Sequence, residues 1–169
     1  IMPSREWKER VLGERWYPGE TISVAIGQSY VTVTPLQMAT LIGTIANNGL
    51  QYQPRVVRQL EKRHDGTFVD IKPLRSGVVP IQHDTLIALR EALRDVVASG
   101  TGRRAQLRDI SISGKTGTAQ VVSLGKVESE DAVPRRLRDH AWFVAYAPSD
   151  DPKIAVSVIV EHMGHGGAV

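Results

Sequence analysis

Residues 113–118, with the sequence Ser-Gly-Lys-Thr-Gly-Thr, constrain the fold of this chain more than any other segment. Isoleucines and valines precede and follow the segment, and β-branched residues favour a strand. On a pleated strand the hydroxyls of Thr116 and Thr118 project from the same face. Lys115 adds a compact positive charge with three donors, and Gly117 lets a ligand backbone approach closely. The segment therefore predicts one wall of a cleft that binds a carboxylate.

A phosphate-binding loop is a second interpretation, since Gly114-Lys115-Thr116 looks like the end of a Walker A motif. That motif requires another glycine five positions before Gly114, and Asp109 occupies this position. A carboxylate there would repel phosphate. We therefore reject a nucleotide-binding function.

Seven segments, which are distributed along most of the chain, carry a resemblance to a known family. They are residues 16–21 (Trp-Tyr-Pro-Gly-Glu-Thr), 26–30 (Ile-Gly-Gln-Ser-Tyr), 34–39 (Thr-Pro-Leu-Gln-Met-Ala), 46–49 (Ala-Asn-Asn-Gly), 100–102 (Gly-Thr-Gly), 114–120 (Gly-Lys-Thr-Gly-Thr-Ala-Gln) and 145–148 (Ala-Tyr-Ala-Pro). In this order they resemble the C-terminal portion of the transpeptidase domain of class B penicillin-binding proteins, notably the elongation-type penicillin-binding protein 2. Lys-Thr-Gly is the third signature element of penicillin-binding proteins and serine β-lactamases. The resemblance implies an α+β fold in which an antiparallel sheet packs with helices.

The chemistry of this family also needs a Ser-x-x-Lys motif at the start of a helix and a Ser-x-Asn motif. The single Ser-x-x-Lys, at 123–126, follows Lys-Thr-Gly instead of preceding it, and it contains Gly125. The only asparagines are Asn47 and Asn48, and neither belongs to a Ser-x-Asn motif. We therefore do not assign Ser123 as the nucleophile. We expect residues 1–169 to be one incomplete transpeptidase domain, without these two motifs and the C-terminal helix, that is inactive alone.

The resemblance gives each residue of the predicted wall a role. Lys115 would supply positive potential and help to hold the proton-relay serine. The hydroxyls of Thr116 and Thr118 would bind the terminal carboxylate of a D-Ala-D-Ala stem peptide or of a β-lactam. The backbone N–H of Thr118 would form half of the oxyanion hole, and Gly117 would let the substrate lie alongside the strand. Lys115 and Thr118 are thus the expected catalytic residues, and Thr116, Gly117 and Thr118 the expected substrate-binding residues.

The resemblance also implies what the intact protein does. It would be a peptidoglycan D,D-transpeptidase that cross-links stem peptides through a serine acyl-enzyme, is acylated by β-lactams and uses no cofactor. Its partners would include a glycosyltransferase and elongation-complex proteins. A helix outside this chain would anchor it in the inner membrane, with this domain in the periplasm. The alternative is a non-catalytic relative of the same fold that serves in binding or scaffolding.

Composition and charge exclude other classes. With 23% charged and 41% apolar residues, the chain of 169 residues does not have the composition of a disordered protein. Its formal charge of +3 is mild and the basic residues are scattered, so we expect no nucleic-acid partner. Without cysteine it has no disulfide or thiolate metal site. Glu161, His162 and His165 fit a glycine-rich exit turn better than a metal site. No apolar run approaches the roughly 18 residues that span a bilayer.

Periodicity and turn residues predict the remaining elements. Residues 1–33 look irregular because prolines and glycines interrupt them. The other expected elements are a largely buried helix near 35–47, a hairpin with strands 55–60 and 67–71, a helix at 82–98, and strands at about 110–122, 140–147 and 153–161. A tight turn joins the last two strands, so we expect them to pair antiparallel. Residues 123–139 form a long charged connection, which we expect to be a mobile flap over the cleft.

Overall fold

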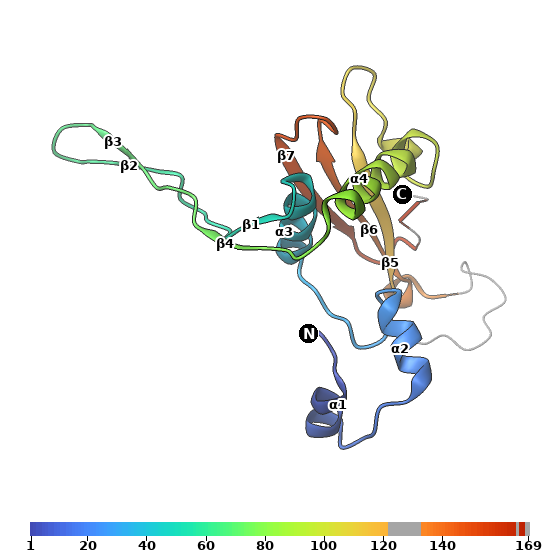
Figure 1. Cartoon of the computed structure of the whole chain (residues 1–169). Helices are drawn as coiled ribbons and strands as arrows, with labels where there is room; N and C mark the ends of the chain where they lie inside the picture. Colours follow the sequence, from blue (N-terminus) through green and yellow to red (C-terminus); the bar gives the residue numbers. More distant parts are fainter. Residues whose placement is uncertain (122–132, 165, 168–169) are drawn as a thin grey trace. The chain divides into compact units, whose positions relative to one another are not determined.

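The computed structural model describes residues 1–121, 133–164 and 166–167. In chain order the elements are α1 (Arg5–Leu12), α2 (Pro18–Ala25), α3 (Pro35–Ala46), β1 (Leu50–Tyr52), β2 (Gln59–Glu61), β3 (Phe68–Asp70), β4 (Arg75–Val78), α4 (His83–Ala98), the 3-10 helix η1 (Arg103–Ala105), β5 (Ser113–Ala119), the 3-10 helix η3 (Arg135–Leu137), β6 (His140–Ala147) and β7 (Ile154–Val160) (Figure 1). Helices combined with antiparallel strand pairs confirm the α+β class. No helix in the described part of the chain is both long and apolar enough to cross a membrane.

The described chain divides into two compact units. Unit 1 contains Ile1–Gln37, Gly117–Trp142 and Val158–Val169, and unit 2 contains Met38–Thr116 and Phe143–Ser157. The expectation of one domain over 1–169 therefore stays a hypothesis.

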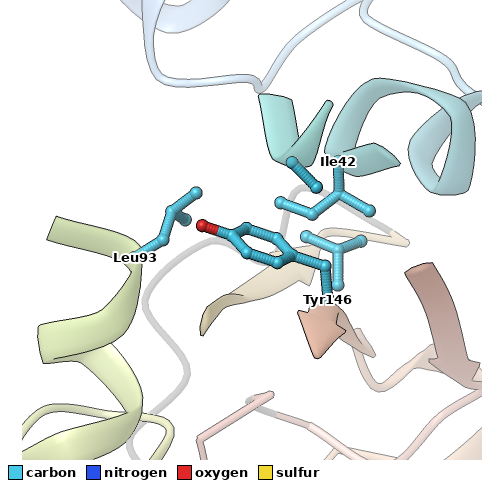
Figure 2. Packing of buried hydrophobic residues seen from close by; sticks show 5 residues of the cluster. Ile42, Leu93 and Tyr146 are labelled. Atoms are coloured by element: carbon cyan, nitrogen blue, oxygen red, sulfur yellow. The ribbon is translucent and has the colours of Figure 1, made fainter. Parts of the chain in front are cut away.

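The core of unit 2 forms where α3 and α4 pack on the end of β6. Its buried members are Ile42, Ala46, Leu93, Val144 and Tyr146. Figure 2 shows the Tyr146 ring between Ile42 of α3 and Leu93 of α4. The prediction for α4 is confirmed, because apolar residues at helical spacing bury one face of this helix.

The prediction that α3 is largely buried is wrong in part. Ile42 and Ala46 are buried, but Leu36 is 61% exposed and Leu41 is 52% exposed. A helix that packs on one layer buries only the stripe that faces this layer, and its other apolar residues stay exposed unless a further element covers them.

Between α3 and α4, residues 50–78 form a two-stranded ribbon, which we call the arm (Figure 1). β1 pairs antiparallel with β4, and β2 pairs antiparallel with β3. Asp65 Oδ1 accepts hydrogen bonds from the backbone N–H and the hydroxyl of Thr67, at 3.0 and 2.7 Å, and Gly66 has a φ of +66°. The predicted hairpin at Asp65-Gly66 is confirmed, with shorter strands, whereas the β1–β4 pair was not predicted.

β5, β6 and β7 form a three-stranded sheet in this order. β6 has the predicted bounds, while β5 and β7 are shorter than predicted. The connection over 148–153, closed by a 2.8 Å hydrogen bond from Lys153 N–H to the Ala147 carbonyl, is too short for a parallel crossover, so β6 and β7 pair antiparallel. Along β7, alternate residues Ile154, Val156 and Val158 are exposed.

Residues 1–33 in unit 1 are not irregular as predicted, because they contain α1 and α2. Ser4 Oγ caps α1 by accepting a 3.1 Å hydrogen bond from Trp7 N–H. Gly13 ends α1 with a φ of +70°, and Pro18 is the first residue of α2. Proline and glycine thus delimit these helices instead of preventing them.

Lys8 of α1 is 1% exposed and ties α1 to α2. Its ammonium donates to Glu20 Oε1 at 2.5 Å and to the Arg15 carbonyl at 3.1 Å, and it lies 3.2 Å from Glu14 Oε2. The hydrogen bond that Lys8 donates to Glu20 raises the pKa of Lys8 and holds the pKa of Glu20 below its usual value. A lysine is rarely this buried unless it is paired, and here both partners keep their charge at neutral pH.

The predicted flap at 123–139 lies mostly outside the described residues, and so do Ser123 and its motif. From residue 133 onward the chain is described. Val133 is 4% exposed, its carbonyl accepts a 3.1 Å hydrogen bond from Arg138 Nε, and Asp139 Oδ1 accepts a 3.3 Å bond from Val121 N–H. Val133 is thus buried, whereas residues 134–136 are exposed, and the mobile flap stays a prediction.

Candidate active site

The predicted wall lies on β5, which confirms the strand prediction for Lys115, Thr116, Gly117 and Thr118. Lys115 is exposed and the other three residues are half-buried. Lys115 Nζ donates a 2.8 Å hydrogen bond to the Thr116 carbonyl. The division between the two units falls between Thr116 and Gly117. Lys115 and Thr116 therefore belong to unit 2, and Gly117 and Thr118 belong to unit 1.

In unit 2, the chain just before the Lys-Thr-Gly segment is fixed by buried contacts. Ser113 is fully buried, and its hydroxyl donates to Ser149 Oγ at 2.8 Å. The backbone N–H of Ser149 donates to the Ser111 carbonyl at 2.9 Å. A Cβ on Gly114 would lie only 2.8 Å from the Val144 carbonyl oxygen on β6, so a side chain there would force the two strands apart. These contacts set the position of β5 where the predicted wall begins.

Thr101 lies beside the predicted wall and was not expected there from the sequence. Its hydroxyl oxygen lies 2.9 Å from the hydroxyl oxygen of Thr116, although the two residues are far apart in the sequence. The sequence signal that points to this position is the Gly-Thr-Gly segment at 100–102, which also contributes to the family resemblance.

The turn that presents Thr101 follows directly from the end of α4. The backbone N–H of Gly100 donates to the Asp95 carbonyl at 3.0 Å, and that of Gly102 donates to the Val96 carbonyl at 2.9 Å. A Cβ on Gly100 would lie 2.9 Å from the Val96 Cα, so only glycine allows the chain to turn back this tightly. Gln106 Nε2 donates to the carbonyls of the last two residues of α4, at 2.9 and 2.6 Å. The helix end is thus capped by the same turn that carries Thr101.

In unit 1, the second half of the segment lies beside β6. A Cβ on Gly117 would lie 3.2 Å from the Cβ of Trp142. A Cβ on Gly166 would overlap the Gly117 carbonyl oxygen, so the chain also passes close to β5 at this point. Gly117 therefore has a packing reason to be glycine, and the predicted approach of a ligand at this position stays a prediction.

Of the histidines considered as metal ligands, His162 makes other contacts. The backbone N–H of His162 donates to His140 Nδ1 at 3.0 Å, and His162 Nδ1 lies 3.2 Å from the Arg138 carbonyl. His165 lies outside the described residues. Among the residues that the structure describes, no three His, Cys, Asp or Glu side chains form a group that could hold a metal ion. The contacts of His162 join the start of β6 to the chain that leaves β7.

A cavity of about 260 Å³ adjoins the buried start of β5, lined by Ile87, Arg90, Glu91, Arg94, Ser113, Tyr146, Ser149 and Asp150. Arg90 Nη2 donates to the Ser149 carbonyl at 3.1 Å, and Arg94 forms a 3.0 Å ion pair with Asp150. Because Glu91 and Asp150 balance the two arginines, the cavity has no excess charge that would select an anion. These residues instead hold α4 against the turn between β6 and β7.

The penicillin binding protein transpeptidase domain matches residues 5–169 of this chain. The peptidoglycan D,D-transpeptidase MrdA of Acinetobacter baumannii is 41% identical over 172 residues, which cover 99% of this chain and 25% of the relative. MrdA of Haemophilus influenzae is 40% identical over 176 residues, which cover 99% of this chain and 26% of the relative. The chain therefore spans about a quarter of the length of these curated relatives.

Solved structures agree with this match. Pseudomonas aeruginosa PBP2 in complex with WCK 5153 is 33% identical with a TM-score of 0.72, over 99% of this chain and 33% of that chain. Helicobacter pylori PBP2, solved in complex with MreC, is 29% identical with a TM-score of 0.77, over 99% of this chain and 28% of that chain. A domain match over nearly the whole chain and PBP2 relatives at this similarity show that the chain belongs to the transpeptidase domain family of the penicillin-binding proteins, in its elongation-type penicillin-binding protein 2 group.

Proposed function

We propose that this chain forms the Lys-Thr-Gly wall of the active site of a peptidoglycan D,D-transpeptidase. The observation that carries the proposal is the position of Lys115 and Thr116 on β5, directly after the buried and anchored Ser113 and Gly114. A strand fixed in this way holds its donors in place before the substrate arrives, which is what electrostatic catalysis requires. The family membership adds that relatives of this chain are named peptidoglycan D,D-transpeptidases.

In this proposal the wall binds the charged end of the substrate. The exposed ammonium of Lys115 supplies positive potential and holds the proton-relay serine. The hydroxyls of Thr116 and Thr118 donate to the terminal carboxylate of a D-Ala-D-Ala stem peptide or to the equivalent carboxylate of a β-lactam. The backbone N–H of Thr118 donates to the oxyanion that develops on the scissile carbonyl, and Gly117 leaves room for the extended substrate.

Thr101 is proposed as a positioning residue for Thr116. A hydroxyl has one hydrogen to donate and two lone pairs that accept. If Thr101 donates to Thr116 Oγ1 across the 2.9 Å contact, the hydrogen of Thr116 is left to point at the substrate carboxylate. Thr101 thereby fixes both the rotamer of Thr116 and the direction of its proton.

The chemistry of the intact protein follows from these roles. A serine outside this chain would attack the D-Ala-D-Ala amide and release the terminal D-alanine, and the resulting acyl-enzyme would pass the stem peptide to the amine of a second one. A β-lactam would acylate the same serine. We propose further that residues 1–169 are part of one larger transpeptidase domain, held in the periplasm by an inner-membrane anchor outside this chain. Its partners would include a glycosyltransferase and elongation-complex proteins, since Helicobacter pylori PBP2 has been solved with MreC.

Labelling with fluorescent penicillin tests this proposal. The full-length protein and residues 1–169 are incubated with the label, denatured and compared on one gel. We expect a labelled band for the full-length protein and none for residues 1–169. A band from residues 1–169 that maps to a serine would contradict the predicted inactivity, and an unlabelled but folded full-length protein would favour the non-catalytic scaffold.

A further inference from the structure

The arm exposes apolar side chains that nothing in unit 2 covers. Every residue from 51 to 76 is exposed, and the exposed side chains include Leu60 at 53%, Phe68 at 61% and Leu74 at 62%. A two-stranded ribbon without a buried face is only marginally stable in water. Apolar residues gathered on such a ribbon do not serve a core of their own, and exposed apolar patches mark interaction sites.

The pairing of β2 with β3 sorts these side chains onto two faces. Leu60 lies directly opposite Val69, so both project from the same face of the ribbon. The neighbouring pairs on this face are joined by backbone hydrogen bonds, from Ile71 N–H to the Arg58 carbonyl at 2.9 Å and from Lys62 N–H to the Thr67 carbonyl at 2.8 Å. Leu60, Val69 and Ile71 therefore occupy this face, with Arg58 at one end and Lys62 at the other. We call it the docking face.

Charge distinguishes the docking face from the opposite one. The two carboxylates of these strands, Glu61 and Asp70, pair with Phe68 and Gln59 and project from the opposite face. The docking face carries Arg58 and Lys62 and no carboxylate. Over residues 50–78 the arm has six Lys or Arg and three Asp or Glu, so the whole arm is basic.

We propose that the docking face binds an extended acidic segment of a partner protein. Arg58 and Lys62 are four residues apart, which is about 13 Å on a strand. A partner strand with carboxylates four residues apart and an apolar residue between them would match both cations and cover Leu60 and Val69. This surface needs neither the Lys-Thr-Gly wall nor transpeptidation, so it goes beyond the proposed function.

Binding of a synthetic peptide to the full-length protein tests the docking face. The probe is a fluorescent peptide with two copies of Glu-Thr-Val-Thr-Glu, and its control replaces each Glu with Lys. By fluorescence anisotropy we expect the acidic peptide to bind at least about tenfold more tightly than the Lys peptide, because its carboxylates meet the two cations. Equal binding of the two peptides, or no binding of either, would overturn the proposal.

Variants decide whether binding occurs on this face. Leu60→Ser combined with Val69→Ser should weaken binding of the acidic peptide by about tenfold or more, and Arg58→Glu with Lys62→Glu should abolish its preference over the Lys peptide. Phe68→Ser is the matched control, since Phe68 is more exposed than Leu60 or Val69 but lies on the opposite face, and it should change the affinity by less than about twofold. All variants should retain penicillin labelling, which shows that they are folded.

A membrane is the competing occupant of a basic and apolar surface. Vesicles of phosphatidylglycerol and phosphatidylethanolamine are therefore added to the complex of the full-length protein with the acidic peptide. We expect the fluorescence anisotropy of the peptide to stay unchanged. Release of the peptide by the vesicles, or an equal effect of Phe68→Ser on peptide affinity, would contradict docking of an acidic protein segment.

Discussion

The start of β5 and the arm are two segments of unit 2 that depend on opposite kinds of stabilisation. At the start of β5, packing restricts which side chains fit. Ser113 is fully buried with its hydroxyl bonded to Ser149, and Gly114 has no room for a Cβ. In the arm, residues 51–76 are all exposed, and the strands are held by backbone pairing within the ribbon and by the hydrogen bonds of Asp65 at its turn.

The free energy of unfolding should therefore depend on the residues at the start of β5 and hardly on those of the arm. Substitutions at the start of β5 should alter stability and thereby the site. Substitutions in the arm should leave stability nearly unchanged, so folding does not account for its apolar side chains. The arm can then be altered to study binding without damage to the wall on β5.

Two glycines give the largest expected contrast between these segments. Gly114→Ala should destabilise the protein by about 1–3 kcal/mol, because the new Cβ would overlap the carbonyl of Val144 and the ring of Phe143. Gly77→Ala on β4 of the arm should cost less than about 0.5 kcal/mol, because the nearest atom to a Cβ there is a side-chain oxygen 3.6 Å away. Urea denaturation of the full-length protein measures both. Equal destabilisation by the two substitutions would contradict the contrast.

Thr101 tests whether the support of β5 extends to the proposed carboxylate contact. Thr101→Val removes the hydroxyl at 2.9 Å from Thr116 and should slow acylation by fluorescent penicillin about three- to tenfold, since one neutral hydrogen bond is lost. Thr101→Ser keeps a hydroxyl and should restore most of the rate. An equal loss in both variants would show that Thr101 acts through packing and not through its hydroxyl.

The smallest effect is expected in the arm. Leu60→Ser should change the free energy of unfolding by less than about 0.5 kcal/mol and leave the acylation rate within about twofold of wild type, because Leu60 is 53% exposed and covers no core. Urea denaturation and penicillin labelling of the same samples measure the two quantities. A loss of more than about 1 kcal/mol would show that Leu60 is buried in the intact protein by a part of it outside this chain.

Local patterns in the sequence were sufficient for much of the fold. The Thr34-Pro35 start of α3, the leucine spacing of α4 and the Asp65-Gly66 turn each reflect interactions within a few residues, and the structure contains all three elements. The strand that carries Lys115 was predictable for the same reason, because β-branched residues surround it.

Features that depend on distant residues were not predictable. The contact of Thr101 with Thr116 exists only once the end of α4 folds back on β5. Lys8 is buried because Glu20 and the Arg15 carbonyl close around it, and a lysine in an isolated sequence suggests an exposed position. The exposure of Leu41 depends on how many layers cover α3, which helical periodicity does not report.

Acylation of a Lys115→Ala variant of the full-length protein tests the assignment of the wall most directly. Lys153→Ala is the matched control, since the side chain of Lys153 is 68% exposed and forms a 2.7 Å ion pair with Asp151, which is 78% exposed. Removing one electrostatic stabiliser from an enclosed site typically costs on the order of 10²- to 10³-fold in rate. We predict that Lys115→Ala slows acylation by fluorescent penicillin by at least about 10²-fold with unchanged unfolding, and that Lys153→Ala stays within about twofold of wild type. Acylation of Lys115→Ala within about threefold of wild type would contradict the role assigned to this strand.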